Sequence, residues 1–209
     1  MALTILVTGF GPFPGAPYNP TKPLVERLAR MRRPALADVK IVSHVFATSY
    51  ADVDRDLPGL IAEHKPRALL MFGLATRTKS LRIETRARNA LALLPDATGV
   101  SLRRNSIRPG GPASVALPAQ TQALLTAAHN VRVPIKLSHD AGRYLCNYLC
   151  WRAAEEARKD NSLRIAAFVH VPAIPRAVRP RAKRHRLTLD DLAHTGSRVL
   201  LALAAAARR

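Results

Sequence analysis

The stretch LTILVTGFGPFPGAPYNPT, residues 3–21, changes character twice along its length. Residues 3–8 are all aliphatic or β-branched, which predicts a strand buried on both faces. Glycines and prolines then mark a long loop. Thr21 follows as the predicted cap of a helix that runs to about Arg32, with Pro23 in its first turn. A buried strand that leads through a loop into a helix is typical of an α/β sheet.

The same alternation continues to the end of the chain. Strands are predicted at 39–46, 67–75, 80–90, 133–139 and 163–171. Helices are predicted at 52–64 (bent near Pro58), at 114–130 (helical from about Pro118), at 142–158, and from Thr188, with Asp191 in a capping box, to about Ala207. This order predicts an α/β fold: a three-layer α/β/α sandwich with a mostly parallel, twisted central sheet. The 209 residues contain neither a repeat nor a low-complexity linker, so one domain over 1–209 is expected.

The composition bounds the class of protein. An apolar fraction of 48% is ordinary for a packed globular domain. No stretch of about 18 apolar residues is present, so no membrane span is expected. The N-terminal apolar run lacks a basic start and a small-residue cleavage site, so it reads as a strand rather than a signal peptide. A cytoplasmic protein is therefore expected.

The formal net charge of +19 is the strongest compositional signal, and it suggests affinity for anionic partners. The basic residues are nevertheless scattered, with one dense cluster, RAVRPRAKRHR, at 176–186. Aromatic residues make up only 5% of the chain, which leaves few platforms for stacking bases. Specific nucleic-acid binding is therefore not expected, although the cluster 176–186 keeps a basic binding surface open as an alternative.

The two cysteines of the chain, Cys146 and Cys150, fall one helical turn apart on the predicted helix 142–158. That spacing disfavours a disulfide, and no zinc-type spacing is present, so reduced thiols and no metal are expected. Cys146 lies in the first turns, where unpaired N–H groups favour a thiolate. It is therefore the better candidate nucleophile. The alternative is that both cysteines are apolar filler.

A thiol nucleophile needs a base, and often a third group that orients the base. His170 ends the predicted strand 163–171, and ligands gather beyond such strand ends. Glu84 is an isolated acidic residue flanked by Arg82 and Arg86, and it is the candidate orienting group. The alternatives are a hydrogen-bonded structural histidine and a surface ion pair.

Three separated segments together resemble the pyroglutamyl peptidase I family of cysteine peptidases. They are ILVTGFGPFPGAPYNPT, AGRYLCN and FVHVP, at 5–21, 141–147 and 168–172. A fourth segment, GLATRTKSLRIETRARN, matches the family pattern at Gly73, Ala75, Glu84, Ala87 and Asn89. The order of the glutamate, cysteine and histidine and the separations between them also match. The resemblance spans residues 5–175.

The resemblance implies that Cys146 is the nucleophile, that His170 is the general base and acid, and that Glu84 orients the imidazole. The implied reaction is hydrolysis of the peptide bond after an N-terminal pyroglutamate, through a thioacyl-enzyme and without a cofactor or metal. The implied partners are pyroglutamyl peptides and further copies of the chain, as a tetramer or dimer.

The resemblance also implies a set of substrate contacts. Phe10 and Phe13 would pack on the faces of the small, neutral lactam ring. Asn19 and Leu74 are the further candidates for substrate binding.

Several positions depart from the family pattern. The family usually has a glycine pair and an arginine where this chain has residues 76–78, and often a polar residue at Leu74. Arg82 stands where Ser or Thr is usual, and Thr85 where a basic residue is usual. These changes surround the substrate side rather than the triad. They leave open a catalytically silent homologue that acts as a basic binding protein.

Overall fold

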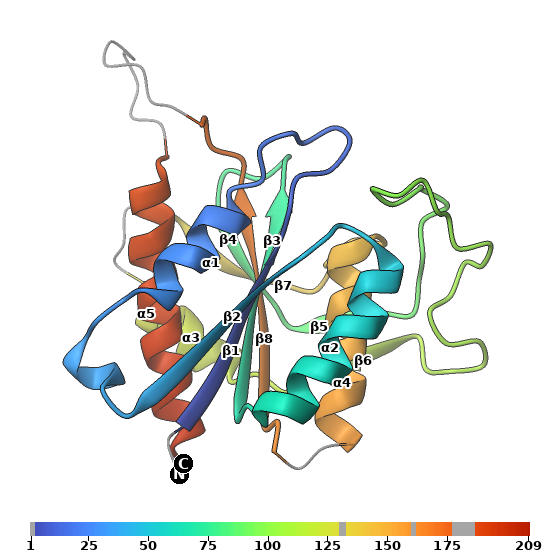
Figure 1. Cartoon of the computed structure of the whole chain (residues 1–209). Helices are drawn as coiled ribbons and strands as arrows, with labels where there is room; N and C mark the ends of the chain where they lie inside the picture. The colour runs from blue at the N-terminus through green and yellow to red at the C-terminus, as the bar shows by residue number, and fades with distance from the viewer. Residues whose placement is uncertain (1–2, 130–132, 160–161, 177–186) are drawn as a thin grey trace.

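The computed structural model describes residues 3–129, 133–159, 162–176 and 187–209. Its central sheet has six strands in the order β2-β1-β3-β8-β4-β7. Their bounds are β1 Leu3–Phe10, β2 Val39–Phe46, β3 Ala68–Ala75, β4 Leu81–Glu84, β7 Ile135–Ser138 and β8 Ile165–Pro172. The helices are α1 Thr21–Ala29, the short η1 Pro34–Leu36, α2 Tyr50–His64, α3 Thr121–Ala128, α4 Leu145–Lys159 and α5 Leu189–Ala207. Figure 1 shows helices on both sides of the sheet.

The sheet is mostly parallel, as predicted. Strand β1 pairs in parallel with β2 and β3, and β3 pairs in parallel with β8. Strand β4 pairs antiparallel with β8 and parallel with β7. The carboxyl ends of β1, β3 and β8 therefore meet at one edge of the sheet, where β4 begins.

Two apolar layers flank the sheet, because successive side chains of a strand point to opposite faces. Ile5 and Val7 of β1 pack in the layer that holds α1, α3 and α5, whereas Leu6 and Phe10 pack in the layer that holds α2 and α4. The predicted three-layer α/β/α sandwich is therefore confirmed. Within the described ranges, no helix is both long enough and apolar enough to span a membrane.

Several element boundaries were predicted closely. Strand β2 has the predicted bounds 39–46. Thr188 and Asp191 form the predicted capping box at the start of α5. Helix α2 begins slightly earlier than predicted, is capped by Ser49, and contains Pro58 within its span. Of the basic cluster 176–186, residues 177–186 lie outside the described residues.

In the segment 114–130, where a helix was expected from about Pro118, the helix begins three residues later, and an unpredicted strand precedes it. Ser114–Ala116 forms strand β6, which pairs antiparallel with β5 at Arg86–Arg88, and helix α3 begins only at Thr121. The segment 80–90 is accordingly two strands that belong to different sheets. The division falls at Thr85. Its backbone N–H donates a hydrogen bond to the carbonyl of Ser138, and its carbonyl accepts a hydrogen bond from the N–H of Leu117.

The prediction that Thr21 caps α1 was also wrong. The N-cap residue is Pro20, without a side-chain hydrogen bond, and the helix ends at Ala29. The Thr21 hydroxyl instead donates to the carbonyl of Phe10, and it lies 3.0 Å from the Phe10 nitrogen, from which it accepts. This exchange fastens the start of the helix to the end of β1. It also fixes both ends of the intervening loop.

Candidate active site

His170 lies near the carboxyl end of β8, in register with Gly73 of β3 on one side and Arg82 of β4 on the other. Its side chain is on the sheet face covered by α2 and α4, because Phe168, two residues earlier, packs in that layer. The residue is 4% exposed, so the imidazole is shielded from solvent.

Glu84 is the partner of this imidazole. The Nδ1 atom of His170 lies 2.7 Å from Oε1 of Glu84, and the glutamate is fully buried. A surface ion pair with Arg82 or Arg86 is therefore excluded as the role of Glu84. Because Nδ1 faces the carboxylate, Nε2 is the ring nitrogen left for another group.

Cys146 is the second residue of α4 and is partly exposed. A Cβ atom placed on Gly73 would lie only 2.7 Å from its sulfur, so the thiol lies directly over Gly73. Since Gly73 is the register partner of His170, the sulfur lies over the strand next to the one that carries the imidazole. Glycine at position 73 makes room for the sulfur.

The pKa of His170 reports how these groups interact. Burial alone lowers the pKa, but the charge and hydrogen bond of Cys146 and those of Glu84 outweigh burial and raise it to about 9. The imidazole is therefore protonated at neutral pH. It is held between a sulfur and a carboxylate, as a general acid would be.

Cys150 has a different environment. It is fully buried in the apolar layer beneath α4, and burial, followed by the charges of Cys146 and Glu84, raises the pKa of its thiol well above the ordinary value. A neutral, buried thiol is a packing group. Of the two cysteines, only Cys146 has the partial exposure and the neighbours that a nucleophile needs.

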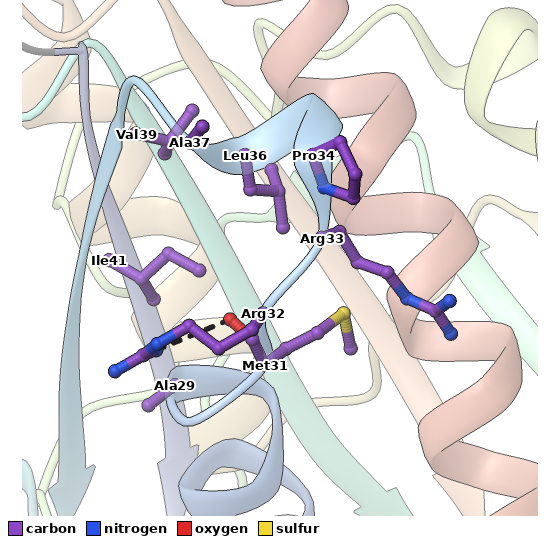
Figure 2. Close-up of a pocket in the computed structure, with 9 residues that line it drawn as sticks. All are labelled: Ala29, Met31, Arg32, Arg33, Pro34, Leu36, Ala37, Val39 and Ile41. Atoms are coloured by element: carbon purple, nitrogen blue, oxygen red, sulfur yellow. Dashed lines mark hydrogen bonds between the residues drawn. The ribbon is translucent and has the colours of Figure 1, made fainter.

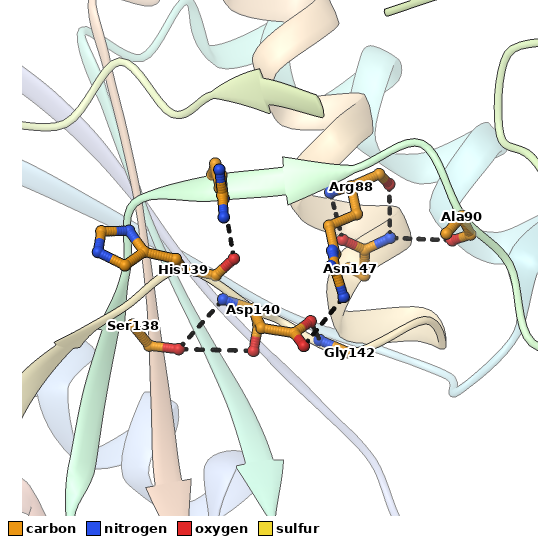
Figure 3. Close-up of polar contacts among 8 residues, drawn as sticks. Arg88, Ala90, Ser138, His139, Asp140, Gly142 and Asn147 are labelled. Carbon is orange, nitrogen blue, oxygen red and sulfur yellow. Dashed lines mark hydrogen bonds and ion pairs between the residues drawn. The ribbon is translucent and has the colours of Figure 1, made fainter. Parts of the chain in front are cut away.

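Asn147 fixes the start of α4 to the segment after Glu84. Its Oδ1 accepts from the Arg88 nitrogen at 2.8 Å, and its Nδ2 donates to the carbonyls of Arg88 and Ala90 (Figure 3). Its side chain is fully buried. Sequence reasoning assigned no role to Asn147, although a polar residue on the buried side of a helix beside a candidate nucleophile is a usable signal.

The loop before α4 is held in a similar way (Figure 3). Asp140 accepts from the Gly142 nitrogen at 3.0 Å and forms an ion pair with Arg88 at 3.1 Å. Gly142 has a φ of 84°, a conformation that glycine adopts without strain. Arg88 is thus tied through its side chain to the loop and through its backbone to Asn147.

The two aromatic candidates lie in and after the end of β1. Phe10 is 2% exposed, and its ring centroid lies 5.9 Å from that of Phe46. Phe13 is partly exposed and forms an isolated bridge with Ala16 in the loop. Only Phe13 therefore offers a partly open ring face, while Phe10 forms part of the packed layer.

The other two candidates lie close to the same edge. The Asn19 amide donates to the Gly11 carbonyl, and its oxygen accepts from the nitrogen of Thr21 and lies 2.9 Å from the Thr21 hydroxyl oxygen. Asn19 therefore uses its side chain to hold the loop. Leu74 is partly exposed and directly follows Gly73 in β3.

A cavity of about 630 Å³ lies elsewhere, between the end of α1, η1 and the beginning of β2 (Figure 2). Met31, Leu36 and Ile41 contribute apolar walls, and Arg32 and Arg33 are also among its lining residues. None of the candidate residues lines it. In the described part of the chain, no three His, Cys, Asp or Glu side chains are grouped to hold a metal ion.

The family model described as pyroglutamyl peptidase matches residues 3–200. The pyrrolidone-carboxylate peptidase of Pyrococcus furiosus is 28% identical over 177 residues, 84% of each chain. That of Clavibacter michiganensis is 31% identical over 170 residues, which cover 81% of this chain and 78% of the relative.

Solved structures are similar over nearly the whole chain. The crystal structure of Bacillus amyloliquefaciens pyroglutamyl peptidase I has a TM-score of 0.83 at 26% identity and covers 97% of each chain. The pyrrolidone carboxyl peptidase from Thermococcus litoralis has a TM-score of 0.85 at 23% identity, covers 96% of this chain and 93% of its own, and shares the fold.

Proposed function

The chain belongs to the pyroglutamyl peptidase family, and from this premise we propose that it is a cysteine peptidase that removes an N-terminal pyroglutamyl residue from peptides. The observation that carries the proposal is the meeting of three groups from α4, β8 and β4. The Cys146 sulfur lies over Gly73, beside His170, whose other face contacts Glu84. A thiol, an imidazole and a carboxylate in this order form a nucleophile, a proton carrier and an orienting group.

The first half of the reaction forms a thioester. The Cys146 sulfur attacks the acyl carbon of the pyroglutamyl residue, and the carbonyl oxygen becomes an oxyanion. Backbone N–H groups at the start of α4 have no partner within the helix, so they can stabilise this charge. The protonated His170 then gives its proton to the leaving amine, the carbon–nitrogen bond breaks, and a thioacyl-enzyme remains.

The second half returns the enzyme to its starting state. Neutral His170 takes a proton from water, and the resulting hydroxide attacks the thioester carbon. The carbon–sulfur bond breaks and pyroglutamate leaves, while the sulfur and the imidazole regain the charges they had at the start. Throughout, Glu84 accepts the Nδ1–H of His170 and keeps Nε2 directed at the reacting atoms.

Substrate recognition follows from the chemistry of the lactam. The ring is flat and neutral, so aromatic walls and a few hydrogen bonds suit it. A free N-terminal ammonium group would be costly to transfer into such a pocket. We assign Phe13 to the open wall and Phe10 to the packed base of this pocket, with Asn19 shaping the loop and Leu74 contributing through its backbone next to Gly73.

Cellular location and assembly extend the proposal. We propose a cytoplasmic enzyme, which is supported by two free cysteines within the described residues. We also propose a homo-oligomer, a dimer or tetramer. The strongly exposed Leu93, Leu94 and Val100 support it, because exposed apolar side chains close together along the chain are typical of contact surfaces.

The decisive experiment uses a fluorogenic pyroglutamyl amide under reducing conditions. The wild type is expected to release the fluorophore, Cys146→Ala to release none, and Cys150→Ala to stay active. Circular dichroism of the three proteins controls for folding. A folded wild type that leaves the amide intact, or equal activity in Cys146→Ala, contradicts the proposed function.

A further inference from the structure

One row of residues crosses the sheet through the candidate site. His170 is in register with Gly73 of β3 and with Arg82 of β4, and Arg82 is in register with Lys136 of β7. The Cys146 sulfur lies over Gly73. The row therefore runs from the nucleophile to the imidazole and then to two cationic side chains at the far side of the sheet.

The other end of the row lies on β1. Thr8 is in register with Met71 of β3, the last pair between these strands, and Phe10 and Gly73 each follow two residues later, on the same face of the sheet. The proposed pyroglutamyl pocket is therefore on the β1 side of the sulfur. Because His170 gives its proton to the leaving amine, the departing peptide lies on the opposite side, over β4.

Arg82 is on the same face as the catalytic groups. Directly opposed residues of an antiparallel pair extend to one face, so Arg82 and His170 share it. The position of Glu84 also places Arg82 on this face, because Glu84 is two residues from Arg82 on β4 and contacts the imidazole.

The charge of Arg82 has no hydrogen-bond or ion-pair partner in the part of the chain that the structure describes. Its Nε atom is buried and lacks a hydrogen-bond partner within the described residues, and no ion pair of Arg82 is formed there. Glu84, two residues along β4 on the same face, contacts His170 through Oε1 and forms no hydrogen bond or ion pair with Arg82 within the described residues, although its Oε2 atom also lacks a partner there. Lys136, the next residue in the row, is exposed. Two cations in adjacent register, Arg82 and Lys136, are unfavourable for the sheet itself.

We propose that Arg82 selects substrates that carry a carboxylate on the leaving peptide, immediately beyond the scissile bond. A guanidinium group binds a carboxylate through two parallel hydrogen bonds, which favours an anion held at a fixed position. The carboxylate is either the side chain of an acidic residue after pyroglutamate or the C-terminus of a pyroglutamyl dipeptide. This inference rests on the proposed function and names a substrate class for it.

The test compares matched pairs of substrates with the wild type and Arg82→Gln. Pyroglutamyl-glutamate amide is paired with pyroglutamyl-glutamine amide, and pyroglutamyl-alanine with its amide. The wild type is expected to show a kcat/KM about tenfold higher for the charged member of at least one pair, the effect of one charge-assisted hydrogen bond. In Arg82→Gln that preference disappears, while turnover of the neutral members stays within about twofold. The pair that responds identifies the source of the carboxylate.

Two further variants test whether the preference depends on the guanidinium group at position 82 or on the net charge of the protein. Arg82→Lys keeps the charge but loses the second hydrogen bond, so it should retain part of the preference. Arg164→Gln removes an exposed charge at the opposite end of β8 and should retain all of it. The wild type alone gives an independent measurement, because added salt should reduce its preference by screening, even if Arg82→Gln fails to fold.

Failure of the proposed selectivity can be distinguished from failure of the proposed peptidase function. A wild type that cleaves both members of each pair equally, or an Arg82→Gln protein that slows all four substrates to the same degree, overturns the selectivity and leaves the peptidase intact. A wild type that cleaves none of the four overturns the proposed function itself.

Discussion

His170 and Glu84 belong to strands that run in opposite directions, and their side chains meet diagonally across that pair. Glu84 is opposite Phe168, and His170 is two residues further along β8, yet Nδ1 and Oε1 are 2.7 Å apart. Diagonal neighbours on one face are within reach of long side chains. Because β4 is antiparallel to β8, the Glu84 carboxylate reaches Nδ1 of the imidazole from the β4 side. The ring side that faces Cys146 is left open.

Glu84→Gln should change the pH dependence as well as the rate. The glutamate is one of the groups that raise the pKa of His170 to about 9. Protonated His170 is the proposed acid, so activity is present below this pKa and is lost as pH rises through it. Removing the charge lowers the pKa of His170, and the alkaline limb of kcat/KM should move to lower pH. The rate should fall about a hundredfold or more. A limb that stays in place would show that Glu84 does not act on the imidazole.

The two cysteines should differ in reactivity. Cys146 is partly exposed beside a protonated imidazole, whereas Cys150 is fully buried with a pKa raised well above the ordinary value. Iodoacetamide at neutral pH should therefore modify Cys146 first, with loss of activity in proportion. Mass spectrometry of the digested protein locates the label. His170→Gln should slow labelling of Cys146 and leave Cys150 unchanged, and equal labelling of both thiols in the wild type would count against activation.

Gly73→Ala should remove activity. The added methyl carbon would lie 2.7 Å from the Cys146 sulfur and 2.5 Å from the ring of Phe168, closer than real contacts allow. The matched control is Gly59→Ala in α2, where nothing lies within 4 Å. That variant should keep its activity and gain about 0.5–1 kcal/mol in the free energy of unfolding, because alanine favours a helix over glycine. A fully active Gly73→Ala would show that the sulfur does not lie over this residue.

Asn147→Ala should both lower the free energy of unfolding and reduce kcat. The change leaves the Arg88 nitrogen and two carbonyls without their buried partner, at a cost of about 2–3 kcal/mol in unfolding free energy. Urea unfolding measures this loss. Under conditions where the variant is folded, kcat should fall more than KM rises, since the start of α4 carries the nucleophile.

The control for Asn147 is Asn89→Ala. Asn89 makes a similar pair of bonds to the backbone of Arg108, but at a partly exposed position where water can replace it. Asn89→Ala should lower the free energy of unfolding by less than about 1 kcal/mol and leave kcat unchanged. Equal kinetic effects of the two changes would assign Asn147 a general structural role only.

Phe13→Ala tests the substrate pocket without disturbing the core. Its ring is partly exposed, so truncation should leave the free energy of unfolding nearly unchanged, whereas Phe10→Ala in the packed layer should cost about 3–5 kcal/mol. Loss of an aromatic wall should raise KM for a pyroglutamyl amide about tenfold. An unchanged KM would remove Phe13 from the pocket.

The sequence was sufficient where one local signal decides the outcome. The segment VKIVSHVF, rich in β-branched residues, predicted the bounds 39–46 of β2, and Thr188 with Asp191 predicted the cap of α5. The signals failed where a tertiary partner takes the group. The Thr21 hydroxyl bonds to the backbone of Phe10 instead of capping α1, and residues 114–116 form a strand because β5 lies beside them.

The same distinction applies to the site. The residue types and their resemblance to a family placed Cys146, His170 and Glu84 as candidates, and the fold brings them together. The tether made by Asn147 could not be derived from spacing, because its partners at Arg88 and Ala90 lie nearly 60 residues away in sequence. The same holds for Arg82, whose neighbour His170 is set by strand register.

The five residues 76–80 carry the chain from β3 past the end of β8 into β4, and their number sets which side of the sheet the carboxylate occupies. Side chains alternate along a strand, so slipping β4 by a single position would turn Glu84 away and present Ile83 or Thr85 to the imidazole. The residue types in this connection can therefore vary, whereas its length is constrained. Homologues that retain the chemistry should tolerate insertions here only as compensated pairs or as outward bulges.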